Sequence, residues 1–290
     1  MLHPRDRRGP ELSPAPIPTP VKDGIYRIAA LERFDGLVHG ISTRTAPDGS
    51  DWNLSALRGT AEHPPSIGTA LANRHRLAAM LAISPEKMVG CQQVHGTQVA
   101  VVGVQDAGRG VMAGVPAIRG CDALVTATPD LYLLALSADC PPVFFYDPVR
   151  RVVGLAHSGW KGTVGRISAN VVRAMSHNFA SRPRDIVAAV GPGIGRCCYT
   201  VREDVVQAVE QAFSDAWTQV GHCPPLLSRH DGAFWFDIPS AIYRTLLEAG
   251  IPPASISVEG ICTAHNRHIF YSHRGEAGMC GLFGAVIGMR

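Results

Sequence analysis

Three side chains that could bind a metal ion lie where apolar segments end. Cys140 follows the apolar run LYLLALS, and His157 ends the run VVGLAH. His95 lies in CQQVHGTQV, where Gly96 permits a sharp turn. Ligands are held precisely where the chain leaves a rigid sheet. Two imidazoles and one thiolate suit Zn²⁺ and leave a fourth position for water or substrate, as catalytic zinc sites do.

The same residue types are compatible with other chemistry. Cys140 and His157 could act as nucleophile and base in an amide hydrolase, for example one that trims peptidoglycan precursors. A cysteine after an apolar strand can also be a buried small hydrophobe, and a lone histidine can be structural. A metal-stabilised binding protein without turnover is a third possibility. The spacing is not a short-range zinc motif, so the residues alone leave these alternatives open.

A glycine-rich turn, HSGWKGTVGRI, follows directly after the VVGLA run and leads into an apolar helical pattern. Free N–H groups at a helix start attract anions, so Gly159, Lys161 and Gly162 are candidate phosphate ligands. The alternative is that the glycines serve only the tight turn. No full P-loop signature supports the first interpretation.

The composition excludes several classes of partner. The chain has 290 residues, a net charge of +3 and interspersed acids and bases, so nucleic acid is not the expected partner. Its eight cysteines form no CxxC pair, and the first residues resemble no secretory leader. No apolar run is long enough to span a bilayer. We therefore expect a reduced, soluble, cytoplasmic protein without a membrane partner, whose oligomeric state the sequence leaves open.

The chain divides into a tail and one domain. Residues 1–23 are rich in proline and small residues and predict a disordered tail, while residues 24–290 predict a single catalytic domain. Apolar periodicity predicts helices within 66–83, 164–179, 205–213 and 242–247, the first carrying Ile67 on its apolar stripe. Continuous apolar runs predict strands, buried on both faces, at 97–104, 131–137, 143–147, 152–157, 185–190, 255–263 and 283–288. This order favours an α+β fold of mixed sheets covered by helices.

Several ordered blocks resemble one known family. These are QQVHG, GCDALVT, SADCPPV, AHSGWKG, GPGIGRCCYTV and CTAH running into YSHRGE. Together they resemble the YfiH family, also called laccase-domain, polyphenol oxidase-like or DUF152 proteins. The similarity spans about residues 34–289. It implies a sandwich of mixed β-sheets flanked by helices in α/β/β/α layers.

The resemblance also implies a function. In the family, the residues matching His95, Cys140 and His157 bind zinc, with Cys140 and His157 at the catalytic centre. The implied activity is phosphorolysis of the purine nucleosides adenosine, inosine and methylthioadenosine, with adenosine deamination beside it. Arg44 and Asn53 match an arginine and an asparagine of the family's N-terminal block, where they could contact phosphate, sugar or base. A solvated loop arginine and a turn asparagine are the alternatives.

Some features depart from the family pattern or from related enzymes. Ser158 and Lys161 replace the more usual alanine and arginine, and Leu282 stands where many relatives carry arginine, which puts substrate preference in doubt. The adjacent Cys197 and Cys198, like His265, are expected to be structural. Copper oxidation is a weaker alternative because the His-x-His pairs of a multicopper laccase are absent, and the H-x-E and PCxxC motifs of classical zinc deaminases are absent too.

Overall fold

The computed structural model describes residues 21–290. The predicted disordered tail therefore lies almost entirely outside the described residues and stays a prediction. Val21–Lys22 form strand β1, which pairs with β2, Ile25–Tyr26. Pairing between β-strands thus begins at Val21, slightly before the expected domain boundary at residue 24.

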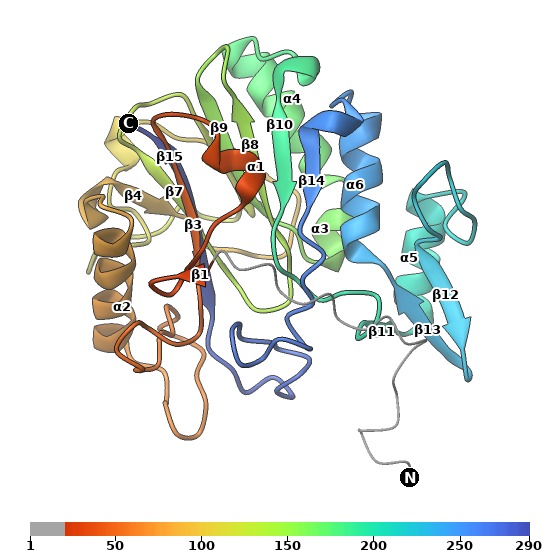
Figure 1. The fold of residues 1–290 in the computed structure, drawn as a ribbon, viewed down its shortest axis with the longest axis horizontal. Coiled ribbons are helices and arrows are strands. Elements are labelled where there is room, and N and C mark those ends of the chain that lie inside the picture. Colours follow the sequence, from red (N-terminus) through yellow and green to blue (C-terminus); the bar gives the residue numbers. More distant parts are fainter. Residues whose placement is uncertain (1–20) are drawn as a thin grey trace.

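Two mixed six-stranded sheets form the centre of the molecule (Figure 1). The first has the order β1-β2-β3-β15-β7-β4, and the second has the order β14-β10-β8-β9-β6-β5. The further strands of the first sheet are β3 Leu37–Ser42, β15 Phe283–Met289, β7 Tyr132–Ser137 and β4 Met88–Gly90. Those of the second are β14 Ile256–Val258, β10 Val187–Val190, β8 Pro142–Asp147, β9 Val152–His157, β6 Ala123–Thr126 and β5 Val99–Val101.

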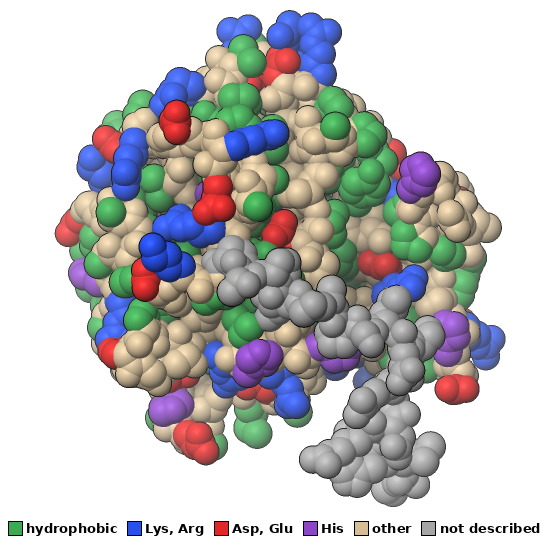
Figure 2. Space-filling view, viewed as in Figure 1, with side chains coloured by type: hydrophobic (Ala, Val, Ile, Leu, Met, Phe, Trp, Pro, Cys, Tyr) green, Lys and Arg blue, Asp and Glu red, His purple; other side chains and the backbone are tan. Residues whose placement is uncertain are grey.

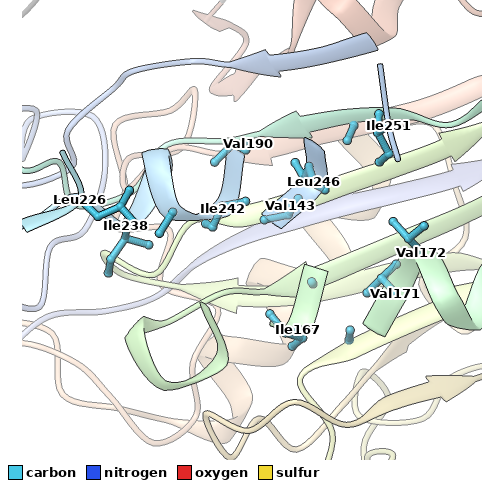
Figure 3. Close-up of a cluster of buried hydrophobic side chains, with 14 of the residues drawn as sticks. Val143, Ile167, Val171, Val172, Val190, Leu226, Ile238, Ile242, Leu246 and Ile251 are labelled. Atoms are coloured by element: carbon cyan, nitrogen blue, oxygen red, sulfur yellow. The ribbon is translucent and has the colours of Figure 1, made fainter. Parts of the chain in front are cut away.

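Helices cover the outer face of each sheet. Helix α2, Ile67–Met80, packs on the first sheet through a cluster that includes Leu77 and Val286. Helices α4, Ile167–Phe179, and α6, Ile238–Glu248, pack on the second sheet (Figures 1 and 3). The remaining helices are α1 Ala29–Glu32, α3 Trp160–Val164 and α5 Glu203–Ala212. The predicted α+β sandwich with α/β/β/α layers is confirmed.

Strand β8 shows why the central strands are apolar throughout. Val143 and Phe145 belong to the cluster under α4 and α6, while Phe144 and Tyr146 belong to the cluster between the two sheets. Successive side chains of a strand point to opposite faces, and here both faces are covered. All residues of β8 and β9 are buried. The β8–β9 pair forms the antiparallel hairpin predicted around Pro148.

Other details differ from the sequence prediction. Ile67 is 68% exposed because it begins α2 on the solvent side, and Ala70, Asn73, Leu77 and Ala78 form the buried face. Strands β1, β2, β3, β4 and β6 and a small third sheet were not predicted. That sheet contains β11 Thr200–Val201, β13 Ala233–Phe236 and β12 Leu227–His230. Its hairpin turns at Asp231 and Gly232, both with positive φ, as the Asp-Gly pair indicates.

Among residues 21–290, none of the helices is long and apolar enough to cross a membrane. Figure 2 shows basic and acidic side chains interspersed over the face in view. This distribution agrees with the absence of a basic stripe in the sequence.

Candidate metal centre and active site

His95, Cys140 and His157 converge in the structure. One potential ligand atom of each lies within 4.8 Å of the corresponding atoms of the other two. The rings of His95 and His157 stand nearly perpendicular, with centroids 4.9 Å apart. His95 lies in the connection between β4 and β5, Cys140 between β7 and β8, and His157 at the end of β9. The three predicted ligands therefore meet although they come from separate parts of the chain.

The β8–β9 hairpin places two of the three. Pro142, the first residue of β8, pairs with His157, the last residue of β9. Proline is accepted at the first position of a strand, so it extends the sheet here rather than ending it. Cys140, two residues earlier, is thereby held close to His157. The Ser137 hydroxyl donates to the backbone carbonyl of Cys140 and closes the turn after β7.

Asp122 organises the other side of the site. Its carboxylate accepts hydrogen bonds from the backbone N–H groups of Val94, His95 and Gly96, at 3.1, 3.0 and 2.7 Å. It also accepts one from Nδ1 of His157 at 3.0 Å. Asp122 is only 1% exposed. One buried carboxylate thus fixes both the His95 loop and the His157 ring.

The backbone at His95 departs from the prediction. The sharp turn was attributed to Gly96, but the residue with positive φ is His95 itself, at 59°. A non-glycine residue in this conformation is uncommon and costs free energy unless its surroundings enforce it. The three N–H groups gathered on Asp122 provide that enforcement, and they turn the His95 ring toward Cys140 and His157.

The donor set fits a metal ion such as zinc. Because Nδ1–H of His157 donates to Asp122, the other ring nitrogen is free to face Cys140, an arrangement common among metal-binding histidines. Gly159 keeps space beside the sulfur: a Cβ there would lie 2.9 Å from Cys140 Sγ and 3.3 Å from His95 Cδ2. The trio accordingly forms a candidate metal site with three protein ligands.

Without metal, these groups perturb one another's pKa. Burial opposes charge on Cys140, but the nearby His157 and His95 lower the pKa of the thiol to about 6. Burial likewise disfavours the charged His157 ring, yet Cys140 and Asp122 raise its pKa to about 9. Burial acts against ionised Asp122 as well, and its hydrogen bonds keep the pKa of that carboxyl low. Near neutral pH the metal-free site therefore favours a thiolate on Cys140 paired with an imidazolium on His157.

A cavity of about 410 Å³ opens onto the three ligands. This volume is typical of a small-molecule site. Arg58 and Arg74 contribute cationic groups to its wall, and Gln92 and Gln93 contribute amides. The apolar part of the lining includes Leu57, Leu134, Leu136, Ala138 and Leu282. The cavity therefore combines an apolar wall, positive charge and the candidate metal ligands.

The predicted phosphate ligands after β9 do not line this cavity. Gly159 is the N-cap residue of α3, which is only five residues long. Gly162 is buried, and a Cβ there would lie 2.9 Å from the backbone oxygen of Gly96. Lys161 is exposed, with its ammonium 5.7 Å from the ring centre of Trp160. Both glycines are closely packed and Lys161 lies outside the described cavity, so their role as phosphate ligands stays a prediction.

Arg44 and Asn53 have structural partners. The Arg44 guanidinium pairs with Glu276 at 3.0 Å and lies over the ring of Tyr271. Asn53 is buried, and its side-chain oxygen accepts from the backbone N–H groups of Ser55 and Leu282 at 2.9 Å. Neither residue lines the cavity. The Asn53 amide donates to the backbone carbonyl of Arg58 and so shapes the loop that carries this arginine into the cavity wall, while a substrate contact of Arg44 or Asn53 stays a prediction.

Asp122 and Arg58 were missed by sequence reasoning. Asp122 immediately precedes the buried strand β6, and an acidic residue at such a position is a signal that could have identified it. Arg58 is exposed and donates to Nδ1 of His273 at 3.2 Å. Arg74 is already committed to the backbone oxygens of Leu54 and Gly110. Of the two arginines in the cavity wall, Arg58 is therefore the one whose guanidinium is more available to bind a ligand.

Comparison with known proteins identifies the family. Residues 54–290 match the family model described as multi-copper polyphenol oxidoreductase laccase. The chain belongs to this laccase-like family. The purine nucleoside phosphorylase YlmD of Geobacillus stearothermophilus is 37% identical over 218 residues, which cover 75% of this chain and 78% of the relative. The adenosine deaminase RL5, from an unknown prokaryotic organism, is 32% identical over 201 residues, covering 69% and 74% of the two chains.

A solved structure agrees with this family membership. The Bacillus licheniformis hypothetical protein YfiH superposes with a TM-score of 0.81 at 30% sequence identity. The match covers 93% of this chain and 97% of that one. The four-layer fold and the family resemblance found in the sequence are both confirmed.

The pKa of Cys140 gives a testable pH dependence. Because only the thiolate is nucleophilic, alkylation of Cys140 in the metal-free chain should accelerate as pH rises through about 6, and not through the ordinary value of 9. The measurement is the rate of iodoacetamide labelling at Cys140, followed by peptide mass between pH 5 and 10. Cys223 is a buried thiol outside the site, so the rate of its labelling is the internal reference for whether the chain stays folded. A midpoint near 9 for Cys140 would contradict the ion-pair assignment.

Proposed function

We propose that this chain is a zinc-dependent purine nucleoside phosphorylase that acts on adenosine, inosine and methylthioadenosine and also deaminates adenosine. The observation that carries the proposal is the convergence of His95 on the Cys140–His157 pair at the wall of a cavity. The family membership and the names of the relatives support it. The proposed setting is the cytoplasm, where the eight cysteines, all unpaired in the described structure, would stay reduced.

Zinc is the metal that this ligand set favours. Imidazole and thiolate ligands suit zinc, and three protein ligands leave one position open. When bound, the ion supplies a Lewis acid that polarises an oxygen in the cavity. The family description names copper oxidases, but the cavity is lined by one group of three ligands, His95, Cys140 and His157, which suits one ion. A mononuclear site of this kind supports zinc chemistry over a multicopper reaction.

The cavity wall offers complementary places for a nucleoside and phosphate. Leu134, Leu136 and Leu282 provide an apolar surface for a purine ring, and Arg58 can hold an anion beside it. In phosphorolysis a phosphate oxygen bonds to the ribose C1′ while the purine leaves with the electrons of the glycosidic bond. Fixing phosphate next to C1′ lowers the entropic cost of this step. The leucine at 282 adds apolar surface and removes a positive charge compared with relatives that carry arginine there.

An amide hydrolase is the second candidate, and one observation favours it. Cys140, His157 and Asp122 have the order of a nucleophile, base and orienting acid, with His157 Nδ1 bonded to Asp122 at 3.0 Å. Such a triad needs no second imidazole. His95 is held in a strained conformation beside it, which a metal site explains and a triad does not. Nucleoside processing at a metal site is therefore the better-supported candidate than amide hydrolysis.

The two candidates predict opposite effects of His95→Ala. Wild-type enzyme with adenosine and phosphate should form adenine and ribose 1-phosphate, with inosine as the deamination product, and chelation should abolish both reactions. His95→Ala should lose most of the activity and most of the metal bound with Cys140 and His157, because two remaining ligands bind zinc poorly. Products are separated by chromatography. Absence of nucleoside turnover in zinc-loaded enzyme, together with peptidoglycan amide cleavage that survives chelation and His95→Ala, would establish the hydrolase instead.

Arg58 and Lys161 give a second comparison. If Arg58 holds phosphate, Arg58→Ala should raise KM for phosphate about tenfold or more, because a charge-assisted hydrogen bond contributes about 1.5–3 kcal/mol. Lys161→Ala, which removes a cation outside the described cavity, should change that KM less than twofold. Steady-state kinetics with varied phosphate at saturating adenosine measure both. If Lys161→Ala raises KM for phosphate tenfold and Arg58→Ala leaves it unchanged, phosphate binds at the turn after β9 and not at Arg58.

A further inference from the structure

A second group of metal-ligand side chains lies apart from the cavity. Cys197, Cys198, Cys262 and His265 each place a potential ligand atom within 4.8 Å of the other three. Cys197 Sγ lies 3.6 Å from His265 Nδ1. None of the four lines the cavity described above. The sequence predicts structural roles for these residues, and their convergence also gives them the geometry of a metal-ligand set.

Two segments of chain bring the four residues together. Cys197 and Cys198 follow Gly193–Gly195, and Cys262 and His265 lie in the turn after β14. Gly193 forms an isolated parallel bridge with Cys262, and the backbone N–H of Thr263 donates to the carbonyl of Gly193 at 3.0 Å. The segments thus meet through backbone pairing that sets the cysteines opposite one another.

The surroundings of Cys262 suit a thiolate. The backbone N–H of Gly195 donates to Cys262 Sγ at 3.3 Å. N–H groups aimed at a sulfur stabilise its negative charge and orient it. A Cβ on Gly195 would lie 3.2 Å from Cys197 Sγ and 3.4 Å from Cys262 Cβ, so a glycine leaves room for the cluster.

The identity and number of the ligands specify the metal. Three thiols and one imidazole are a set typical of structural zinc sites, in which four protein ligands close the coordination sphere. Cys262 and His265 have the short C-x-x-H spacing that lets one turn supply two ligands. His265 is exposed, so its second ring nitrogen can remain in water, while Cys262 is only 6% exposed.

We propose that Cys197, Cys198, Cys262 and His265 bind a second zinc ion, which holds the 193–198 loop against the turn at 262–265. This site is structural and distinct from the candidate centre at His95, Cys140 and His157. Closing two distant segments with a metal stabilises the folded chain, because the unfolded chain has no preformed site.

The second site also supports the loop that carries Cys140. The backbone N–H of Ile194 donates to the Asp139 carbonyl at 2.7 Å, and the hydroxyl of Thr263 donates to the Asp139 carboxylate at 2.6 Å. Asp139 precedes Cys140 and has a positive φ of 85°. Both segments of the proposed zinc site therefore contact the residue that positions this thiol, so loss of the second zinc should loosen the first site.

Counting metal in the full chain tests the proposal. Protein purified under reducing conditions without chelators should carry two zinc ions per chain by elemental mass spectrometry. Cys198→Ser, Cys262→Ser and His265→Ala should each reduce the count to about one, and His157→Ala should remove the other ion. Cys223→Ser, which alters a buried cysteine outside both groups, should retain two.

Spectroscopy gives an independent measurement if a cysteine variant folds poorly. Cobalt replacing zinc should show the strong thiolate charge-transfer absorption of a three-sulfur site, and His157→Ala should retain most of it. His265→Ala alters an exposed side chain, so it tests the site with little change in packing. A single zinc per chain, unaffected by Cys198→Ser, Cys262→Ser and His265→Ala, would overturn the proposal. A disulfide among these cysteines in freshly reduced and repurified wild-type protein would overturn it as well.

Discussion

The candidate active site depends on the hydrogen bonds of one buried carboxylate, Asp122. It accepts three backbone N–H groups from the loop containing His95 and a fourth N–H from the ring of His157. A buried charge requires such compensation, because an unpaired carboxylate in the interior is strongly unfavourable. The same bonds hold His95 in its unusual backbone conformation. Ligand geometry and local fold therefore have a common cause.

The two-sheet sandwich makes this arrangement rigid. Asp122 directly precedes β6, and His157 ends β9, the strand that pairs with β6. Cys140 lies just before β8, on the other side of β9 in the same sheet. Both faces of the central strands are packed, against α4 and α6 on one side and against the first sheet on the other. Cys140 and His157 consequently stand at the ends of close-packed strands, and Asp122 fixes the loop that carries His95 to the same sheet.

The sequence predicted the parts of this account that depend on local pattern. Continuous apolar runs indicated the central strands, and residue type together with family resemblance indicated His95, Cys140 and His157. Asp122 was not predicted because it lies 27 and 35 residues from the histidines that it holds, and strand pairing alone brings them together. The cluster of Cys197, Cys198, Cys262 and His265 was not predicted for the same reason, since Cys197 and His265 are 68 residues apart in the sequence. Arg58 is placed by Asn53, which the sequence offered either as a substrate contact or as a turn asparagine.

The central claim is that Asp122 positions the metal ligands, and zinc affinity of Asp122→Asn tests it most directly. The amide loses the charge and can accept fewer of the four N–H groups, so affinity at the His95–Cys140–His157 site should fall about 10- to 100-fold. Competition with a chromophoric chelator measures this affinity, and Asp122→Asn is compared with Asp122 in the same Cys262→Ser background, so that only this site is counted and the loss of the second zinc affects both proteins equally. Asp147→Asn is the matched control, because Asp147 is also fully buried and accepts backbone N–H groups, from Val149 and Arg150, but contacts no ligand. Unchanged zinc affinity in a folded Asp122→Asn protein, or an equal loss in Asp147→Asn, would contradict the account.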